Sequence, residues 1–528
     1  MTDATGRRAA LSPPFVTALR WRPSLAWLTT AWPHLTVATV GFMATLWATA
    51  LLWRRIDGLA TPAYDLGFFQ QVVWNVGATG AWISSFQQGS FLGLHFSPIL
   101  AVPAVIERLV GPDVRVLSLL HAIGIGALAP AAFLFIRAAL RPNAFAAPIA
   151  AALAIGLPVW ATMQWVLRSD FHPELAGVVF ALLAGWAGLS GRPRAMWILG
   201  LIALATREDV AYAIAVIGLV VMARGRGPMR RHGRVLTVAA VTWGIVVFGL
   251  EMPGLRDGAL SDTASYYGWL GSGSAVLTAP LTMADRIVAA LTRPAPWFVV
   301  AGMLIALVGL PLLRPRWLLL VVPPLVAALL SSHPPQAALI LQYPLILLVP
   351  LLVAAAMGAR RALAIVGRSR RRLRARGRAR GPRLVSTQLA ALVPLLVLVL
   401  AVPAVVGAWV QGSIPPFIGA DAAFLGRPPA IDELRAFALN IPSDAFLVAD
   451  EGLVAPLAAR PAIRRLTATE RPAQQAFLLI DRLAWSPSRE SAARRERILG
   501  MLPTSGRPRI ADDGRFVLWG PRPEGTAP

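Results

Sequence analysis

The sequence contains no cysteine, no lysine and little charge of either sign. Charged residues make up 14% of its 528 residues, against about 25% in an ordinary soluble domain. Without cysteine the chain has no disulfide, thiolate zinc site, cysteine nucleophile or c-type haem attachment. All 50 basic residues are arginine. This excludes the mechanisms that need a lysine amine: those of P-loop NTPases, protein kinases and pyridoxal-phosphate enzymes.

Apolar residues, by contrast, make up 56% of the chain. This rules out a soluble globular protein and a disordered one. We expect an all-α polytopic membrane protein with a small C-terminal α/β domain. A span needs about 20 apolar residues. The clear candidates are 33–53, 114–136, 144–163, 175–190, 235–250, 295–313, 317–332, 338–357 and 387–411.

Arginine placement predicts the orientation, because arginine-rich loops stay cytoplasmic. Six segments that we place inside hold 26 arginines and one acid; they are 1–32, 137–143, 191–195, 224–234, 314–316 and 359–383. The rest of the chain up to residue 411 holds 9 arginines and 12 acids. We therefore expect a cytoplasmic N-terminal leader at 1–32, a membrane domain at 33–411 and an extracytoplasmic domain at 412–528.

This arrangement has about 11 transmembrane helices if 196–206 and 210–223 form a hairpin. A rival arrangement makes 94–110 a crossing and 196–223 one continuous helix. It would carry four arginines outside, against the rule just applied.

The hairpin tip, Arg207-Glu208-Asp209, is the strongest single functional signal. The two arms would reach only about 16 and 21 Å at 1.5 Å per residue, so neither crosses alone. Charges at such a depth are costly and usually functional. The alternative is an arginine–carboxylate cluster that satisfies itself at a helix break.

The run Arg368–Arg380 lies in a predicted cytoplasmic loop. It is either an anionic-lipid or nucleic-acid patch or a topology anchor, and we favour the anchor. The net charge of +24 therefore does not indicate a nucleic-acid partner. The expected partners are membrane lipids.

Residues 412–528 have shorter apolar runs and interspersed charges. Ile431–Asn440 is typical of an amphipathic helix, and Ala445–Ala449 and Ala476–Ile480 are typical of buried strands. Ser488–Leu502 predicts a charged helix, and Asp512–Trp519 predicts a turn that leads into a strand.

Further candidate site residues lie in the outer loops. Residues 64–75 have helical spacing and predict an interfacial helix, with Asp65 at its N-cap. Asp65 is a cap, a general base at the membrane surface, or both. His95 and Tyr343 each adjoin an apolar segment, where a structural role and a ligand contact are both open.

Four ionisable residues, Arg168, Asp170, His172 and Glu174, fall within seven positions at the mouth of a span. Pro173 and Glu174 suit the first turn of a helix. Asp170, His172 and Glu174 are also candidate ligands of a hard divalent ion, but their spacing matches no standard motif. The metal stays undetermined.

The chain resembles the bacterial multi-pass membrane proteins grouped as domain-of-unknown-function family 2079. The resemblance runs over roughly residues 35–520 and rests on YDLGFFQQVVWN at 64–75, HFSP at 95–98, FHPE at 171–174, TRED at 206–209, Ile441–Ala445 and Leu457–Arg460. Family members usually have lysine where Arg207 stands, and often a His-Tyr pair where Gln342-Tyr343 stands. The architecture is similar to that of GT-C lipid-linked glycosyltransferases, and the implied location is the bacterial plasma (inner) membrane.

This resemblance implies a function and a set of site residues. GT-C enzymes take a sugar from a polyprenyl phosphate on the outer face, and an acidic residue just after the first span acts as base or metal ligand. Asp65 occupies the matching place. The residues expected to be catalytic are Asp65, Glu208 and Asp209. Those expected to bind substrate are Arg207, Arg168, His95, His172, Glu174 and Tyr343, with the arginines stabilising the departing phosphate.

Two other classes of function stay open. Short broken helices with charge also suit a transporter or lipid flippase, although we find no internal repeat and the charges gather on one face. The third reading is a non-catalytic membrane scaffold whose outer tail binds a partner.

Overall fold

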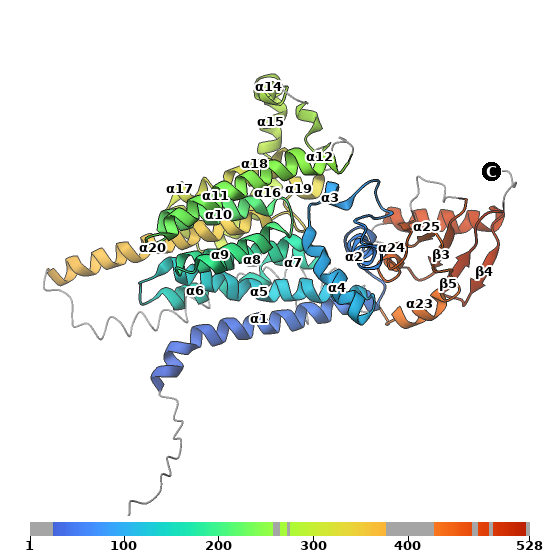
Figure 1. Cartoon of the computed structure of the whole chain (residues 1–528), viewed down its shortest axis with the longest axis horizontal. Coiled ribbons are helices and arrows are strands. Elements are labelled where there is room, and N and C mark those ends of the chain that lie inside the picture. Colours follow the sequence, from blue (N-terminus) through green and yellow to red (C-terminus); the bar gives the residue numbers. More distant parts are fainter. Residues whose placement is uncertain are drawn as a thin grey trace, which may run out of the picture.

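The computed structural model describes residues 25–256, 265–271, 275–375, 427–466, 474–484 and 489–523. The expected span 387–411, most of the leader and the start of the tail lie outside these residues. The described part has a long helical body with a small sheet domain at one end (Figure 1).

The helical body is built from many elements of unequal length. Its first half comprises α1 (Leu25–Asp57), η1 (Ala63–Gly67), α2 (Phe68–Thr79), α3 (Phe91–Leu94), η2 (Pro98–Leu100), α4 (Ala101–Val110), α5 (Val114–Leu140), α6 (Ala146–Ala154), η3 (Leu157–Val159), α7 (Ala161–Arg168), α8 (Pro173–Leu189), α9 (Pro193–Leu204) and α10 (Val210–Arg224). The second half comprises α11 (Met229–Val246), η4 (Val247–Glu251), α12 (Met252–Gly254), η5 (Gly268–Leu270), α14 (Ala275–Thr282), α15 (Ala284–Leu291), α16 (Pro294–Ala306), η6 (Leu310–Leu313), α17 (Pro315–Leu318), α18 (Val322–Leu330), α19 (Pro334–Ala337) and α20 (Leu345–Ala375).

Among the described residues, four helices are long and apolar enough to span a membrane: Ala31–Asp57, Val114–Leu140, Met229–Gly254 and Leu345–Arg368. Two bent pairs raise the count to six: Ala146–Val159 with Ala161–Arg168, bent by 42°, and Ala284–Leu291 with Pro294–Ala306, bent by 41°. The protein is membrane-embedded, and the expected count of about 11 helices is not confirmed.

Proline explains why several expected spans are divided into shorter helices. It lacks a backbone N–H donor, and its ring clashes with the preceding helical turn. The expected span 144–163 divides at Leu157–Val159, which contains Pro158. The expected span 338–357 becomes helical only at Leu345, after Pro344. The segments 295–313 and 317–332 are likewise divided among shorter helices.

The hairpin between α9 and α10 is present, because α9 ends at Leu204 and α10 begins at Val210. The rival arrangement, with one continuous helix at 196–223, is therefore wrong. Its proposed crossing at 94–110 is also absent. That stretch holds the short η2 and the ten-residue α4, and ten helical residues reach only about 15 Å.

Several arginine-rich turns meet at the end of the body that lies away from the sheet domain (Figure 1). Arg360 donates hydrogen bonds to the carbonyl oxygens of Ala139 at 2.8 Å and Arg141 at 3.2 Å. Its charge also interacts with those of Arg224 and Arg314. These turns are distant from one another in sequence, and their arginine content predicts that all are cytoplasmic. They share one end of the molecule.

The tail forms a five-stranded sheet in the order β2-β1-β3-β5-β4. Its strands are β1 (Leu447–Ala449), β2 (Ile463–Arg465), β3 (Phe477–Asp481), β4 (Arg509–Asp512) and β5 (Phe516–Trp519), and its helices are α23 (Ile431–Ala438), α24 (Glu451–Val454), α25 (Arg489–Met501) and η7 (Leu502–Thr504). β1 pairs in parallel with β2 and β3, and β5 is antiparallel to β3 and β4. The expected helices, strands and final hairpin are confirmed.

The sheet domain docks onto the segment that follows α1. Leu59 and Ala63 of that segment belong to the same apolar core as Leu434 and Leu453 of the tail. The Ser85 hydroxyl donates to the carbonyl oxygen of Ile463 at 2.6 Å and accepts its backbone N–H at 2.9 Å. The tail therefore shares a core with the segment of the body that follows α1.

This docking depends on a close approach at Gly452. A Cβ atom at this position would overlap the carbonyl oxygen of Leu59, whereas Gly500 on α25 has open space around it. We expect Gly452→Ala to destabilise the protein by about 1–3 kcal/mol through overpacking. The matched control Gly500→Ala should stabilise its helix by up to about 1 kcal/mol. Thermal unfolding and protease cleavage between body and tail measure both. Equal shifts for the two variants would contradict this docking.

Asp450 adds a pH-dependent term to the stability of the tail. Its carboxylate accepts the backbone N–H of Asp481 at 2.9 Å, and burial raises its pKa from 3.8 to about 7. The folded state then holds a proton that the unfolded state releases. Its stabilising contribution is full below about pH 4 and is lost as pH rises through about 7.

We expect Asp450→Asn to remove this loss, because an amide oxygen keeps the hydrogen bond without the charge. Relative to wild type, the variant should gain at most about 4 kcal/mol between pH 4 and pH 8. Unfolding temperatures across that pH range measure the effect, and Asp444→Asn, at an exposed position, is the control. A constant difference at all pH values would contradict the assignment.

Candidate functional site

A cavity of about 810 Å³ lies between the outer segments and the helical body. One part of it is polar, with side chains from η1, the turn before α8 and the hairpin tip. The other part is apolar, with side chains from α10, α11, α18 and α20. The polar part is lined by Asp65, His95, His172, Glu174, Arg207, Glu208, Asp209, Gln342 and Tyr343.

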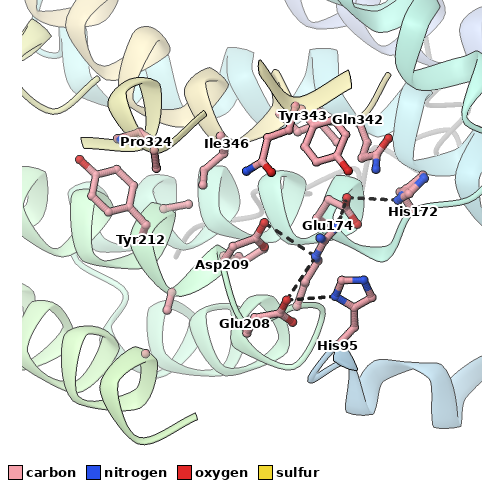
Figure 2. Close-up of a pocket in the computed structure, with 18 of the residues that line it drawn as sticks. His95, His172, Glu174, Glu208, Asp209, Tyr212, Pro324, Gln342, Tyr343 and Ile346 are labelled. Carbon is pink, nitrogen blue, oxygen red and sulfur yellow. Dashed lines mark hydrogen bonds and ion pairs between the residues drawn. The ribbon is translucent and has the colours of Figure 1, made fainter. Parts of the chain in front are cut away.

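The ionisable groups of the polar part form one connected chain (Figure 2). His172 lies between Asp65, with Nε2 to Oδ1 at 3.5 Å, and Glu174, with Nδ1 to Oε1 at 3.2 Å. Glu174 Oε1 then accepts a hydrogen bond from the Arg207 guanidinium at 2.5 Å.

Beyond Arg207 the chain continues to Glu208 at 3.6 Å and Asp209 at 3.8 Å. Glu208 in turn contacts His95 Nδ1 at 3.1 Å and accepts the backbone N–H of Phe96 at 2.9 Å. The structure thus brings together seven of the nine expected site residues in a single network.

Exposure separates the carboxylates into two kinds. The side chains of Glu174 and Glu208 are only 6% and 3% exposed, so they serve to hold Arg207 and the histidines. The side chains of Asp65 and Asp209 are 30% and 31% exposed. Asp65 and Asp209 are therefore the carboxylates that a bound molecule can reach.

The environment of His172 favours its charged form. Burial lowers its pKa, but Glu174 and Asp65 outweigh burial and hold the pKa of His172 above its usual value. A protonated imidazole thus lies beside the Asp65 carboxylate. It also supplies a second positive charge next to Arg207.

The turn that carries His172 is fixed by Asp170. Asp170 is fully buried, has a positive φ of 60° and pairs with Arg55 at the end of α1, at 2.6 Å. The backbone N–H of His172 donates to Nδ1 of the buried His121 at 3.4 Å. Asp170 therefore positions this turn and does not face the cavity. Pro173 begins α8, as expected.

The capping role expected for Asp65 is wrong. Asp65 lies inside the π-helical turn η1, whose N-cap is Pro62, and α2 begins only at Phe68 after Gly67. No side-chain capping bond forms at either helix start. α2 is buried along most of its length, mainly against η1, α4 and neighbouring segments of the body, and its expected interfacial location stays a prediction. The Asp65 carboxylate is therefore not engaged as a cap.

Glu451 of the tail secures the same turn. Its carboxylate accepts the backbone N–H of Ala63 at 2.9 Å, and Arg465 places its guanidinium 4.5 Å from the centre of the Tyr64 ring. The sequence offered no signal for these contacts, because they join residues nearly 400 positions apart.

Arg168 does not line the cavity, and its guanidinium lies over the Trp165 ring at 5.1 Å. It therefore drops out of the candidate set. Among the described residues, no group of three or more His, Asp and Glu side chains is arranged to hold a metal ion. The candidate ligands Asp170, His172 and Glu174 do not converge, since Asp170 faces Arg55 instead.

The apolar part of the cavity opens sideways. Val241, Ile245 and Phe248 line it, yet each is also exposed on the outer surface of the body. α11 and η4 belong to the candidate span Met229–Gly254, and their exposed apolar side chains suit contact with the hydrocarbon of a bilayer. Sequence periodicity did not reveal this opening, since cavity-lining and lipid-facing residues are equally apolar.

Together these features define an integral membrane protein with a partly enclosed, amphipathic cavity. The chain belongs to the family described as "Predicted membrane protein (DUF2079)", whose model matches residues 55–498. The resemblance recognised in the sequence motifs is thereby confirmed. No curated protein matches the chain in sequence.

Among solved structures, the chain is similar to ArnT from Cupriavidus metallidurans bound to undecaprenyl phosphate, at 15% identity and a TM-score of 0.47, over 94% of this chain and 99% of that one. For ArnT in the apo state the identity is 15% and the TM-score 0.46, over 93% and 98%. The chain is also similar to the archaeal oligosaccharyltransferase AglB from Archaeoglobus fulgidus in complex with an inhibitory peptide and a dolichol-phosphate. Here the identity is 13% and the TM-score 0.42, over 82% of this chain and 64% of that one.

The buried network makes Arg207 a stability determinant. Its removal would leave buried Glu174 and Glu208 with only a histidine partner each, so we expect Arg207→Ala to cost about 3–5 kcal/mol. Arg207→Lys should cost less, because a cation remains. Thermal unfolding in detergent measures both, with Arg108→Ala on the exposed face of α4 as the control. If Arg207→Ala and Arg108→Ala unfold at the same temperature, the network is not buried as described.

Proposed function

We propose that this protein is a glycosyltransferase-like membrane enzyme whose donor is a sugar carried on a polyprenyl phosphate. The observation that carries the proposal is the division of one cavity into a polar end and an apolar part that opens toward the bilayer. A ligand that fits this space has a polar head and a long apolar chain. A polyprenyl-phosphate sugar has both.

The polar end offers groups suited to the expected chemistry, an inverting displacement at the anomeric carbon. Asp65 is exposed to the cavity and has His172 behind it, so it is our candidate for the base that removes the proton of the acceptor hydroxyl. Arg207 and protonated His172 would stabilise the departing lipid phosphate. Buried Glu174 and Glu208 would position these cations, and Asp209 remains a candidate second carboxylate.

We further propose that the polar end faces away from the cytoplasm. The arginine-rich turns meet at the opposite end of the body, and such turns stay cytoplasmic. In this proposed orientation the N-terminus lies inside and the sheet domain outside the bacterial plasma membrane. A transporter would need charged groups reachable from both sides. The clustering of this network at one end favours a transferase.

Asp65→Asn tests the proposal directly. The amide keeps the shape of the side chain but cannot accept the acceptor proton, so donor turnover should fall about 10²- to 10⁴-fold. Release of undecaprenyl phosphate from a panel of undecaprenyl-phosphate-linked hexoses and pentoses measures turnover, and undecaprenyl-phosphate binding should be retained.

Asp432→Asn is the matched control, because Asp432 is an exposed carboxylate on α23. Full turnover in Asp65→Asn would remove Asp65 as the base. Failure of the wild-type protein to bind undecaprenyl phosphate at all would overturn the donor class and bring transport or scaffolding to the front.

A further inference from the structure

A second group of polar and aromatic side chains lines the cavity, contributed by the segments 265–271 and 331–344. Tyr266 stacks on His333 with ring centres 4.6 Å apart and planes inclined by 12°. His333 also meets the edge of the Tyr343 ring at 5.6 Å. None of these rings belongs to the chain of ion pairs described above.

Hydrogen bonds hold this group in place. Gln336 donates to the Tyr267 hydroxyl at 3.1 Å and accepts from the Ser331 hydroxyl at 3.0 Å. The Tyr267 hydroxyl donates to the carbonyl oxygen of Ala327 at 3.0 Å. The two segments are thus joined by side chains and form a fixed, uncharged wall.

Gln342 is the exception to this satisfied network. Its side chain lines the cavity and the residue is only 9% exposed, yet its carboxamide oxygen has no hydrogen-bond partner among the described residues. A buried polar atom without a partner is costly, typically by about 1–3 kcal/mol. Because the Gln342 side chain lines the cavity, a ligand held there is one way to supply the missing partner, after a small rotation of the carboxamide.

The backbone around Gln342 is also strained. Leu339 and Leu341 have positive φ angles of 54° and 57°, a region that residues with a Cβ atom rarely adopt. Such strain gathers at ligand sites, where the fold holds a side chain in a required place.

The chemistry of this wall suits a saccharide. A carboxamide both donates and accepts hydrogen bonds, which matches the hydroxyl groups of a sugar. Aromatic rings offer apolar surface with a polar tip, which matches the C–H face of a sugar ring. Uncharged groups attract a phosphate less strongly than the cations of the ionic network do, and polar atoms do not suit a polyprenyl chain.

The wall also lies beside the proposed reaction centre. Tyr343 is near enough to Arg207, Glu174 and Asp65 to interact with their charges. Figure 2 shows Gln342 and Tyr343 in the upper part of the view, above the ion pairs that run through Glu174 to Glu208 and His95. A sugar held on the wall would lie next to these ion pairs.

We propose that Gln342, together with Tyr343 and the Tyr266–His333 stack, forms the subsite that recognises the hydroxyl groups of the transferred sugar. This inference rests on the proposed function, since it presumes a lipid-linked sugar in the cavity. It adds that specificity for the sugar resides in uncharged groups, apart from the ionic network.

The experiment compares two ligands in the full-length protein in detergent. One is undecaprenyl phosphate, and the other is the same lipid carrying glucose, galactose, mannose or arabinose. The variant Gln342→Leu keeps most of the side-chain volume and removes the carboxamide, and Gln88→Leu on an exposed loop is its control. His333→Ala removes the ring under Tyr266 and serves as a second variant.

We expect the wild-type protein to bind one sugar-loaded lipid more tightly than undecaprenyl phosphate. Gln342→Leu should weaken that binding about 10- to 100-fold and leave the affinity for undecaprenyl phosphate unchanged. His333→Ala should do the same to a smaller extent. Thermal unfolding of each variant shows that it is folded.

Two results would overturn the inference while leaving the proposed function intact. The first is a wild-type protein that binds no sugar-loaded lipid more tightly than undecaprenyl phosphate. The second is a folded Gln342→Leu protein whose affinities for the two ligands equal those of wild type, or are reduced by the same factor. Absence of binding to either lipid would instead count against the proposed function itself.

Discussion

The structure depends on how one buried arginine is paired at a break between two short helices. A charge at this depth must be compensated, and Arg207 is compensated by Glu174 from the start of α8 and by its own neighbours on the hairpin tip. Glu174 in turn contacts His172, and Glu208 contacts His95. Pairing one cation thus brings three separate segments of the chain to one place.

The site is completed by the tail. Asp65 sits on a π-helical turn that has no capping bond of its own, and Glu451 supplies an acceptor for the backbone of that turn. The turn is also pressed against Val454 and Ala455 of the sheet domain, close to Gly67. The sheet domain therefore fixes the position of the carboxylate that faces the cavity, although it contributes no residue to the cavity lining.

The sequence predicted those parts of the structure that depend on local chemistry. Charges in apolar sequence identified Arg207 and its neighbours, proline and glutamate identified the start of α8, and turn residues identified the final hairpin. The sequence-based predictions failed where contacts between residues distant in sequence determine the structure. Glu451 and Gln342 gave no signal, because contacts across the fold give them their roles, and β2 was missed because Ile463–Arg465 reads as a charged stretch. Asp65 was found for its location, but its capping role was wrong since the π-helical turn moves the helix start to Phe68.

The polarity of the surroundings orients a ligand before any specific contact forms. Phe248 and Ile245 expose the apolar part of the cavity to the side of the body, and Tyr64 lines the polar part while remaining half-exposed near the tail. A molecule with one polar and one apolar end can occupy this space in only one direction, because the reverse would bury a charged head in hydrocarbon. Buried Glu174 and Glu208 then keep the cations fixed, and only Asp65 and Asp209 are left open to the head. Exposure, more than residue type, decides which carboxylate is available for chemistry.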